Sequence, residues 1–268
     1  LGVEVVSDVP ELGENLQDHL QIRSVYQISG AGTLNERMNS LFGKASIAAE
    51  YLFKRSGPMS MAPSQLGIFT RSNDRFNTAN IEYHVQPLSL DSFGEPLHKT
   101  PGITVSVCNL RPESRGSSHI QSADPNHAPL IDPNYLSAEG DKLVAADSLR
   151  LTRQLMSAKA LAELNPIETK PGLDMATQDD LIRAAGDVAT TIFHPVGTAR
   201  MGVDDGAVVA PDLRVRGISG LRVVDGSVMP NIVSGNTHAP ITMIAEKASD
   251  MILRGSGVTV RCRGEKHQ

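Results

Sequence analysis

The chain has 268 residues with a formal net charge of -5 at pH 7, and 40% of its residues are hydrophobic and 21% charged. This composition is ordinary for a soluble globular protein with one large or two small domains. The net charge gives no reason to expect nucleic acid or an anionic membrane as a partner. No apolar run approaches the roughly 20 residues that a membrane-spanning helix needs, and no signal-peptide pattern is present.

The two cysteines, Cys108 and Cys262, share no local motif. Their isolation argues against a disulfide framework and against a cysteine-based zinc site, and it fits a reducing, cytoplasmic compartment.

The first residues indicate a fragment of a longer protein. Residues 1–20 read LGVEVVSDVPELGENLQDHL, an apolar alternation that runs into a Pro/Gly turn with no N-terminal lead-in. The alternation predicts a short strand over 2–9. Asp18 and His19 are adjacent, and because neighbouring strand residues point to opposite faces we do not expect them to form a dyad.

The next part of the chain predicts one helix and then a sheet. Apolar residues with helical spacing predict a helix over 41–54, which Gly57 and Pro58 end. Strand-like runs follow at 66–70, 81–86, 103–110 and 117–122. Because no helix separates these runs, we expect a mainly antiparallel sheet rather than repeated βαβ units.

The last part of the chain predicts mostly helices. Helical patterns cover 138–163 and 177–189, the second with Thr177 as its N-cap. Residues 221–227 read as a short buried strand. From Ile241 the apolar spacing becomes helical again, with Pro240 in the first turn, and the last dozen residues are polar.

His194 is the first candidate for chemistry, and it lies between an aromatic residue and a proline in FHPVGTARMG (193–202). Proline restricts the residue before it to extended conformations, so His194 would lie on a stiff backbone. A positioned imidazole is the commonest general base near neutral pH. A hydrogen-bonded core or surface histidine fits the same pattern, and the motif alone does not decide between the two.

A second candidate is the sequence Asp225, Gly226, Ser227 at the carboxyl end of the predicted strand over 221–227. Ligands of open α/β sheets bind at that edge, where backbone N–H groups and hydroxyls meet phosphate or ribitol. A simple strand-to-loop turn is the alternative.

A third candidate is the segment from Asn236 to His238, directly before a predicted helix. The free N–H groups at a helix start carry partial positive charge and stabilise a developing anion. An ordinary N-cap by Asn236 or Thr237 is the alternative.

No metal site is predicted. His98, His119 and His127 show no ligand spacing to one another, and His84 lies on a predicted strand, so all four read as structural or exposed. The chain contains no Gly-x-Ser-x-Gly, P-loop or Gly-x-Gly-x-x-Gly motif.

Five blocks of the sequence occur together, and in the same order, in one protein family. They are ELGENLQDHL (11–20), NLRPESRGSSHIQSADP (109–125), PLIDPNYL (129–136), FHPVGTARMG (193–202) and GLRVVDGSVMPNIVSGNTHAPITMIAEKASDMI (220–252). The chain resembles the C-terminal half of the glucose–methanol–choline (GMC) flavoprotein oxidoreductases. The resemblance is greatest to the choline dehydrogenase and alcohol dehydrogenase branch.

This resemblance implies FAD as the cofactor. It also implies oxidation of an alcohol to an aldehyde or ketone, by proton abstraction and hydride transfer to flavin N5. The family's HPxGT histidine faces the flavin and corresponds here to His194; its catalytic partner corresponds to Asn236. His238 would lie near the pyrimidine side of the flavin. The other implied cofactor contacts are Asn15, Asp225, Gly226, Ser227, Ala239 and Pro240.

The implied fold class is α/β with an α+β part. It comprises a remnant of a Rossmann-like FAD-binding domain (1–20), a substrate-binding domain with a mainly antiparallel sheet flanked by helices (21–190), a catalytic segment returning to the FAD-binding domain (191–255) and a tail (256–268). The family's dinucleotide-binding unit is absent from this sequence, so we expect the N-terminal half of the same protein to supply it.

The expected partners are a small-molecule alcohol and an electron acceptor, which is oxygen, a quinone or another carrier. A quinone-linked protein would work at a membrane surface. Two alternatives remain: a cyanohydrin lyase of the same family that keeps FAD and the pair His194 and Asn236, and a non-catalytic fragment that keeps only the fold.

Overall fold

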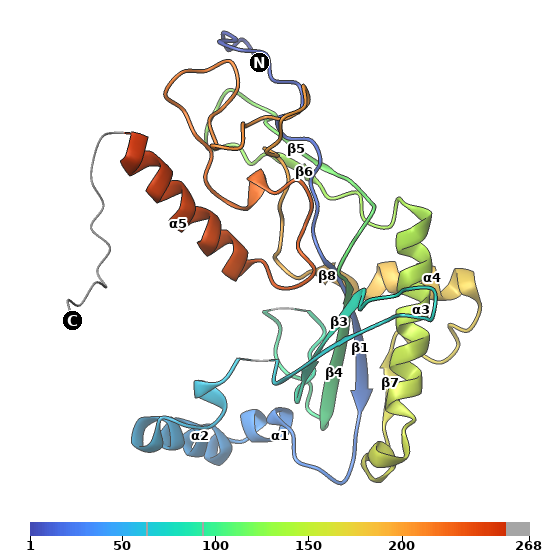
Figure 1. The fold of residues 1–268 in the computed structure, drawn as a ribbon. Helices are drawn as coiled ribbons and strands as arrows, with labels where there is room; N and C mark the ends of the chain where they lie inside the picture. Colours follow the sequence, from blue (N-terminus) through green and yellow to red (C-terminus); the bar gives the residue numbers. More distant parts are fainter. Residues whose placement is uncertain (63, 93, 256–268) are drawn as a thin grey trace, which may run out of the picture. The chain divides into compact units, whose positions relative to one another are not determined.

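The computed structural model describes residues 1–62, 64–92 and 94–255. Cys262 and the predicted tail over 256–268 lie outside the described residues. The chain divides into two compact units (Figure 1). Unit 1 comprises Leu1–Asp18, Glu113–Ser137 and Phe193–Gln268, and unit 2 comprises His19–Pro112 and Ala138–Ile192. Residues 113–137, inside the range 21–190 expected for the substrate domain, therefore belong to unit 1.

Unit 2 is built on a six-stranded sheet in which every pairing is antiparallel. The strand order is β2-β3-β4-β1-β7, and β8 also pairs with β1. The strands are β1 (Leu20–Gln27), β2 (Leu66–Thr70), β3 (Ile81–Gln86), β4 (Gly102–Asn109), β7 (Ile167–Lys170) and β8 (Ala189–Thr191). The predicted fold class, a mainly antiparallel sheet with helices, is confirmed.

The two faces of this sheet have different chemistry. Tyr83 in β3 is opposite Val107 in β4, which is opposite Ile22 in β1, so these apolar residues share one face. The Tyr83 hydroxyl lies 3.1 Å from Thr152 Oγ1 in α3 (Glu139–Met156), and α4 (Gln178–Val188) packs beside α3 (Figure 1). The apolar face is therefore covered by helices.

The other face of the sheet carries polar side chains that are nevertheless largely buried. Glu82 and His84 in β3 and Ser106 and Cys108 in β4 alternate with the apolar set. Burial of polar groups costs free energy unless they find partners. The polar groups on this face are therefore expected to contact a bound ligand or other polar groups of the protein.

The central strand β1 was missed from the sequence. Six of its eight residues are buried, and they include the polar residues Gln21 and Arg23. Its sequence LQIRSVYQ alternates only over its first four residues before Ser24 breaks the period, so its pattern does not stand out. The predicted strands over 66–70 and 81–86 are confirmed with the predicted bounds.

The helices of unit 2 follow their local signals. The helix predicted over 41–54 is α2 (Leu41–Lys54), and the short α1 (Leu34–Asn39) was not predicted. α4 begins after Thr177, whose hydroxyl accepts from the Asp180 N–H, as predicted for the N-cap. α3 ends at Met156 rather than at 163, because the chain turns there and continues as the 3-10 helix Lys159–Leu164.

A buried ion pair joins α3 to β7 in unit 2. Arg153 donates to both carboxylate oxygens of Glu168, each at 2.9 Å, and the Glu168 side chain is 2% exposed. The hydroxyl of Tyr26 donates to the same carboxylate at 3.2 Å. Hydrogen bonding to Glu168 raises the pKa of Arg153, while burial and then Glu168 raise that of Tyr26, so both groups keep their protons.

Unit 1 has its own core and a single long helix among its described residues. The helix is α5 (His238–Gly255), and its Ile244 and Ala248 are buried against Val196, Val208 and Val228. The unit also contains the antiparallel pair β5 (Ser117–His119) and β6 (Leu130–Asp132) and the 3-10 helix Gly226–Val228. β5 is the predicted strand over 117–122, shortened.

Two predicted strands of unit 1 are wrong. Residues 2–9 are not a strand: Val3, Val5 and Val6 are more than 60% exposed, and no strand of the described chain pairs with them. Residues 221–227 form one isolated bridge, between Arg214 and Arg222, and then the 3-10 turn. An extended segment becomes a strand only where a neighbour supplies ladder hydrogen bonds.

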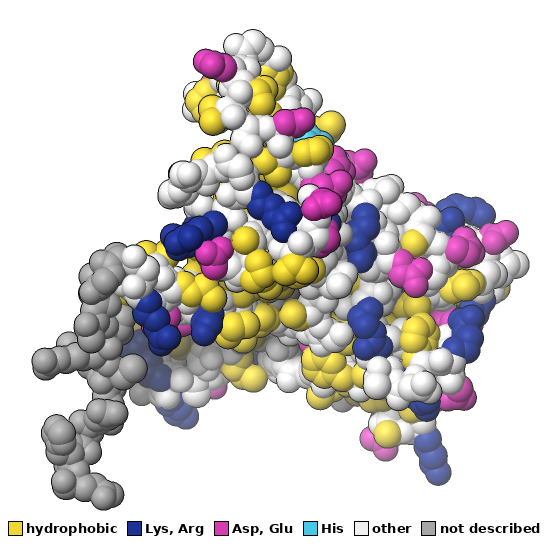
Figure 2. Space-filling view, turned by 45° about the horizontal axis from the view of Figure 1, so that its top comes forward, with side chains coloured by type: hydrophobic (Ala, Val, Ile, Leu, Met, Phe, Trp, Pro, Cys, Tyr) yellow, Lys and Arg dark blue, Asp and Glu magenta, His cyan; other side chains and the backbone are white. Residues whose placement is uncertain are grey.

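Charged side chains of both signs are interspersed over the face shown in Figure 2, with Lys and Arg close to Asp and Glu. None of the described helices is both long and apolar enough to cross a membrane.

Candidate active site

His194 is held on a constrained turn in unit 1. Its backbone N–H donates to Asp18 Oδ1 at 2.9 Å, and the hydroxyl of Tyr135 donates to the other oxygen of the same carboxylate. Asp18 is buried, and Phe193, directly before His194, has a left-handed φ of 65°. A non-glycine residue in this conformation is strained and persists only where its surroundings hold it. The half-buried His194 therefore has a fixed backbone position.

The turn after His194 is paired with residues 15–17. Gln17 and Val196 exchange two backbone hydrogen bonds of 2.9 Å. The Gln17 side chain, 2% exposed, donates to Pro230 O at 3.0 Å and accepts from Ile232 N–H at 3.1 Å. One buried amide thus connects the segment before His19, the histidine turn and the segment that leads to Asn236.

Asn15, predicted as a cofactor contact, makes several hydrogen bonds within the protein. Its amide donates to the carbonyls of Gly197 and Pro230, and its oxygen accepts from Arg115 Nε at 3.1 Å. Its φ of 60° turns the chain toward Gln17. The side chain of Asn15 thus positions the histidine turn, and its contact with a cofactor stays a prediction.

Asp225, Gly226 and Ser227 form a tight turn against the start of α5. Asp225 Oδ1 accepts from the Ser227 N–H at 2.8 Å, and the Ser227 carbonyl accepts from Ala199 N–H at 2.9 Å. A Cβ on Gly226 would lie 3.1 Å from Ile241 Cδ1 and 3.3 Å from Val196 Cγ1. Glycine therefore lets this turn, the histidine turn and the first turn of α5 meet in one core.

Asn236 and His238 both lie at the amino end of α5, where His238 is the first helical residue. Both side chains are exposed, and neither makes a hydrogen bond within the part of the chain that the structure describes. Thr237 between them is 4% exposed, and its carbonyl accepts from the Ile241 N–H at 3.0 Å. The two predicted side chains are thus available to bind a ligand, while Thr237 begins the helix.

Gly197 provides a stability test of the histidine turn. Its φ is 97°, and a Cβ would lie 2.4 Å from the Asn15 carbonyl oxygen. Gly197→Ala is therefore expected to destabilise the protein by about 2–5 kcal/mol, from left-handed strain plus overpacking. Gly220 is the matched control, because its φ is 79° and a Cβ there meets nothing within 4 Å. Gly220→Ala should cost only about 1–2 kcal/mol in urea unfolding; equal losses would contradict the argument.

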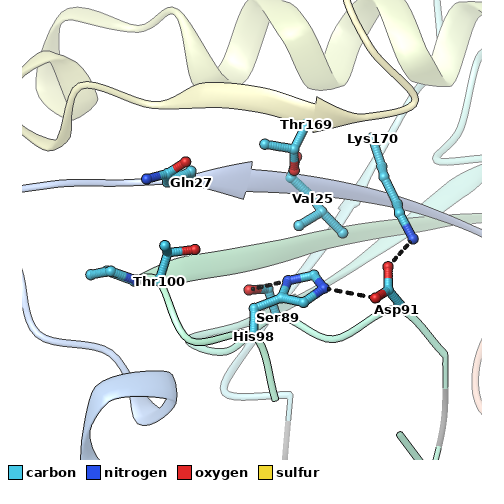
Figure 3. A pocket seen from close by; sticks show the side chains of 9 residues that line it. Val25, Gln27, Ser89, Asp91, His98, Thr100, Thr169 and Lys170 are labelled. Carbon is cyan, nitrogen blue, oxygen red and sulfur yellow. Dashed lines mark hydrogen bonds and ion pairs between the residues drawn. The ribbon is translucent and has the colours of Figure 1, made fainter. Parts of the chain in front are cut away.

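A polar cavity of about 230 Å³ lies in unit 2, at the end of β1 and β7 (Figure 3). Within it His98 Nδ1 lies 3.1 Å from Ser89 Oγ, and His98 Nε2 lies 3.4 Å from Asp91 Oδ2. Lys170 Nζ donates to the other oxygen of Asp91. No predicted site residue lines this cavity.

The hydrogen bond from Lys170, and secondarily that from His98, holds the pKa of Asp91 below its ordinary value. A lowered folded-state pKa adds stability that is complete above the unfolded pKa of about 3.9 and is lost as pH falls through the folded value. Asp91→Asn should therefore lower the Tm at neutral pH, and its difference from wild type should shrink in melts below about pH 4. A difference independent of pH would contradict this assignment.

Comparison with known proteins decides the family. A family model described as GMC oxidoreductase matches residues 112–245, which is half of the chain and includes both the histidine turn and the start of α5. The chain belongs to the GMC oxidoreductase family. The resemblance predicted from the five sequence blocks is confirmed.

Similar curated proteins include an alcohol dehydrogenase and a choline dehydrogenase, the two kinds of protein that the sequence resemblance named. The chain is 37% identical over 253 residues to the alcohol dehydrogenase [acceptor] of Pseudomonas putida, covering 94% of this chain and 46% of that protein. It is 38% identical over 250 residues to an oxygen-dependent choline dehydrogenase of Escherichia coli, covering 93% and 45%. The chain thus spans less than half the length of these GMC relatives.

A solved structure has a similar fold. It is a formate oxidase of Aspergillus oryzae RIB40, from work on FAD modification, and it superposes on this chain with a TM-score of 0.86 at 25% sequence identity. It covers 96% of this chain and 49% of the oxidase.

Several residues that hold the histidine turn in place were not predicted. Asp18, Tyr135, Gln17 and Arg115 act through partners far away in the sequence, such as the N–H of His194. Asp18 and Gln17 stand in the block ELGENLQDHL, but nothing in that block indicates their partners. The sequence places Asp18 beside His19 and does not indicate His194 as its partner; His19 is buried in unit 2, and its Nε2 lies 3.2 Å from Leu110 O.

Proposed function

We propose that the full-length protein containing this chain is an FAD-dependent oxidoreductase that oxidises an alcohol to an aldehyde or ketone. The observation that carries the proposal is the histidine turn of a GMC family member, in which buried Asp18 fixes the backbone of His194 beside the Asp225 turn and α5. The chain's similarity to an alcohol dehydrogenase, to an oxygen-dependent choline dehydrogenase and to a formate oxidase studied for FAD modification agrees with this proposal.

The residues of unit 1 suit a flavin. Asp225 is exposed, and its Oδ2 has no hydrogen-bond partner among the described residues, so it is available to a ribitol hydroxyl. The N–H groups at the start of α5, at His238 and Ala239, carry partial positive charge that suits an electron-rich ring or a phosphate. Asn15, Gly226, Ser227 and Pro240 complete the proposed cofactor contacts. When bound, FAD supplies the two-electron acceptor.

The chain's own residues have separate roles in this reaction. An imidazole nitrogen of His194 takes the hydroxyl proton of the alcohol, and the Asn236 amide hydrogen-bonds the same oxygen. The amino end of α5 stabilises negative charge that develops nearby. We assign flavin binding to unit 1 and substrate binding to the sheet of unit 2, including residues 66–110.

The test is anaerobic mixing of the purified full-length protein with primary alcohols, choline and sugars. We expect at least one of these alcohols to bleach the flavin absorbance, and we expect addition of oxygen, a quinone or an artificial acceptor to restore it. If a cyanohydrin is cleaved while no alcohol bleaches the flavin, the protein is a lyase. A full-length protein that is colourless and binds no added FAD would contradict both activities and indicate a non-catalytic fold.

A further inference from the structure

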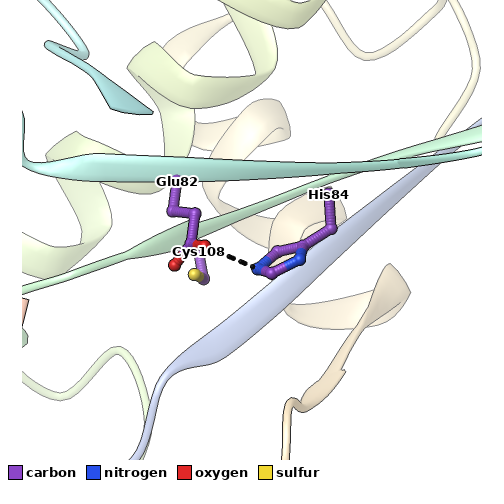
Figure 4. A group of neighbouring side chains, drawn as sticks. All are labelled: Glu82, His84 and Cys108. Atoms are coloured by element: carbon purple, nitrogen blue, oxygen red, sulfur yellow. Dashed lines mark ion pairs between the residues drawn. The ribbon is translucent and has the colours of Figure 1, made fainter. Parts of the chain in front are cut away.

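Three side chains with metal-binding chemistry meet on the polar face of the unit 2 sheet. Glu82 and His84 are two residues apart in β3 and therefore point to the same face. Cys108 in β4 is directly opposite Glu82 in the antiparallel ladder. Figure 4 shows the Glu82 carboxylate, the His84 ring and the Cys108 sulfur close together, with the ion pair between Glu82 and His84 dashed.

The distances suit a shared ligand. One ligand atom from each residue, a carboxylate oxygen, an imidazole nitrogen and a sulfur, lies within 4.8 Å of the other two. Glu82 Oε1 and His84 Nε2 are 3.4 Å apart. A tetrahedral zinc ion with bonds of about 2.0–2.3 Å requires only modest adjustment of such a group.

Two atoms of this group are buried without a hydrogen bond. Glu82 Oε2 and His84 Nε2 are inaccessible to solvent and have no hydrogen-bond partner among the described residues; His84 Nε2 has only the ion-pair contact with Glu82 Oε1, and Glu82 Oε2 has none. The side chains of Glu82 and His84 are 4% and 12% exposed, and Cys108 is 1% exposed. A buried carboxylate oxygen without a partner costs free energy that a bound cation would offset.

We propose that Glu82, His84 and Cys108 form a site for one zinc-type transition-metal ion, with a fourth position left for water or a small ligand. The mixed oxygen, nitrogen and sulfur donors favour such an ion over magnesium or calcium, which take oxygen ligands. The carboxylate and a deprotonated thiol would balance the charge of the dication. The site uses no residue of the His194 site, although its three ligands lie on the sheet to which we assign substrate binding.

The test uses the full-length protein, stripped with a chelator and dialysed, and titrated with Co²⁺ and then Zn²⁺. We expect one equivalent of Co²⁺ to give a thiolate charge-transfer band that Zn²⁺ displaces. Cys108→Ser should abolish that band, and Glu82→Gln should weaken Zn²⁺ binding by more than about 100-fold, since loss of even an outer partner costs about 10–100-fold. His119→Gln, which removes the exposed pair with Glu14, is the matched control and should bind as wild type does.

Circular dichroism and a thermal melt without metal establish that each variant is folded before it is titrated. Zn²⁺ should also raise the Tm of the wild type and of His119→Gln, but not that of Glu82→Gln. Absence of stoichiometric binding to wild type, or unchanged affinity in folded Glu82→Gln and Cys108→Ser, would overturn the site. In that case the cluster is a polar patch of the sheet. Flavin content and alcohol oxidation are measured on the same samples, so failure of the metal site and failure of the proposed function are distinguished.

Discussion

Replacing His194 with alanine in the full-length protein is expected to lower alcohol-dependent flavin reduction by about 100- to 10,000-fold, the usual contribution of a general base. FAD content should stay near that of wild type, because Asp18 binds the backbone N–H of residue 194 and not its ring. Rapid anaerobic mixing with the alcohol measures the reduction step, and absorbance after denaturation measures the bound flavin.

His127→Ala is the matched control, because His127 is an exposed histidine of unit 1 outside the histidine turn. It should leave both the reduction rate and the flavin content unchanged. If His194→Ala reduces the flavin at the wild-type rate, His194 is not the base and the catalytic assignment fails. If the variant instead loses FAD, His194 serves cofactor binding and the rate carries no information about proton transfer.

Replacing Arg153 with methionine should destabilise the protein by about 3–5 kcal/mol, the usual cost of removing one partner of a buried ion pair. The methionine keeps the aliphatic stem but leaves the Glu168 carboxylate, 2% exposed, with the Tyr26 hydroxyl and the Gly172 N–H as its remaining donors. Arg153 also donates to the carbonyls of Gly172 and Met175, so the loop after β7 loses its attachment to α3. Urea unfolding followed by circular dichroism gives the change in free energy.

Arg150→Met is the control one turn earlier on α3. Arg150 pairs with Asp147, and its side chain is 44% exposed. A pair with a partly exposed arginine contributes about 0–1 kcal/mol. Because Asp147 also keeps its contacts with Arg75 and Asn73, this variant should unfold close to wild type. Similar losses for the two variants would mean that helix propensity, not the buried network, explains the effect. The double variant Arg153→Met, Glu168→Gln should recover part of the stability, because it no longer buries an uncompensated charge.

Local patterns predicted most of the helices and the strands β2, β3 and β4 because the relevant physics is short-range, whereas β7 and β8 were not predicted. The bounds of α2 and the N-cap at Thr177 follow from apolar spacing and from one side-chain hydrogen bond within four residues. The strands β2 and β3 were found because each is bounded by turn residues. The strand β1 was missed because its apolar–polar alternation extends over only four residues. Residues 2–9 were misread because alternation alone supplies no neighbouring strand.

The residues of the candidate site also fall into two groups, those with a local sequence signal and those whose partners are distant in the sequence. His194, Asp225 and Asn236 could be proposed from sequence because each stands in a motif whose members are adjacent in the chain. Asp18 and Tyr135 were not recognised, because Asp18 accepts from the N–H of residue 194 and Tyr135 donates to Asp18, each across more than a hundred residues of sequence. The expectation that no metal site exists used spacing along the chain, whereas Glu82, His84 and Cys108 are brought together by the register of β3 and β4.

The sequence by itself therefore determined the family and most of the helices, and it supplied the motif residues proposed for the site, because these depend on short stretches of chain. Only the tertiary structure decided which groups hold the histidine turn, which sheet face is polar and buried, and which residues meet as possible ligands. The physical reason is that long-range pairing has no local signature: strand register and buried hydrogen bonds are chosen by the packing of the whole unit.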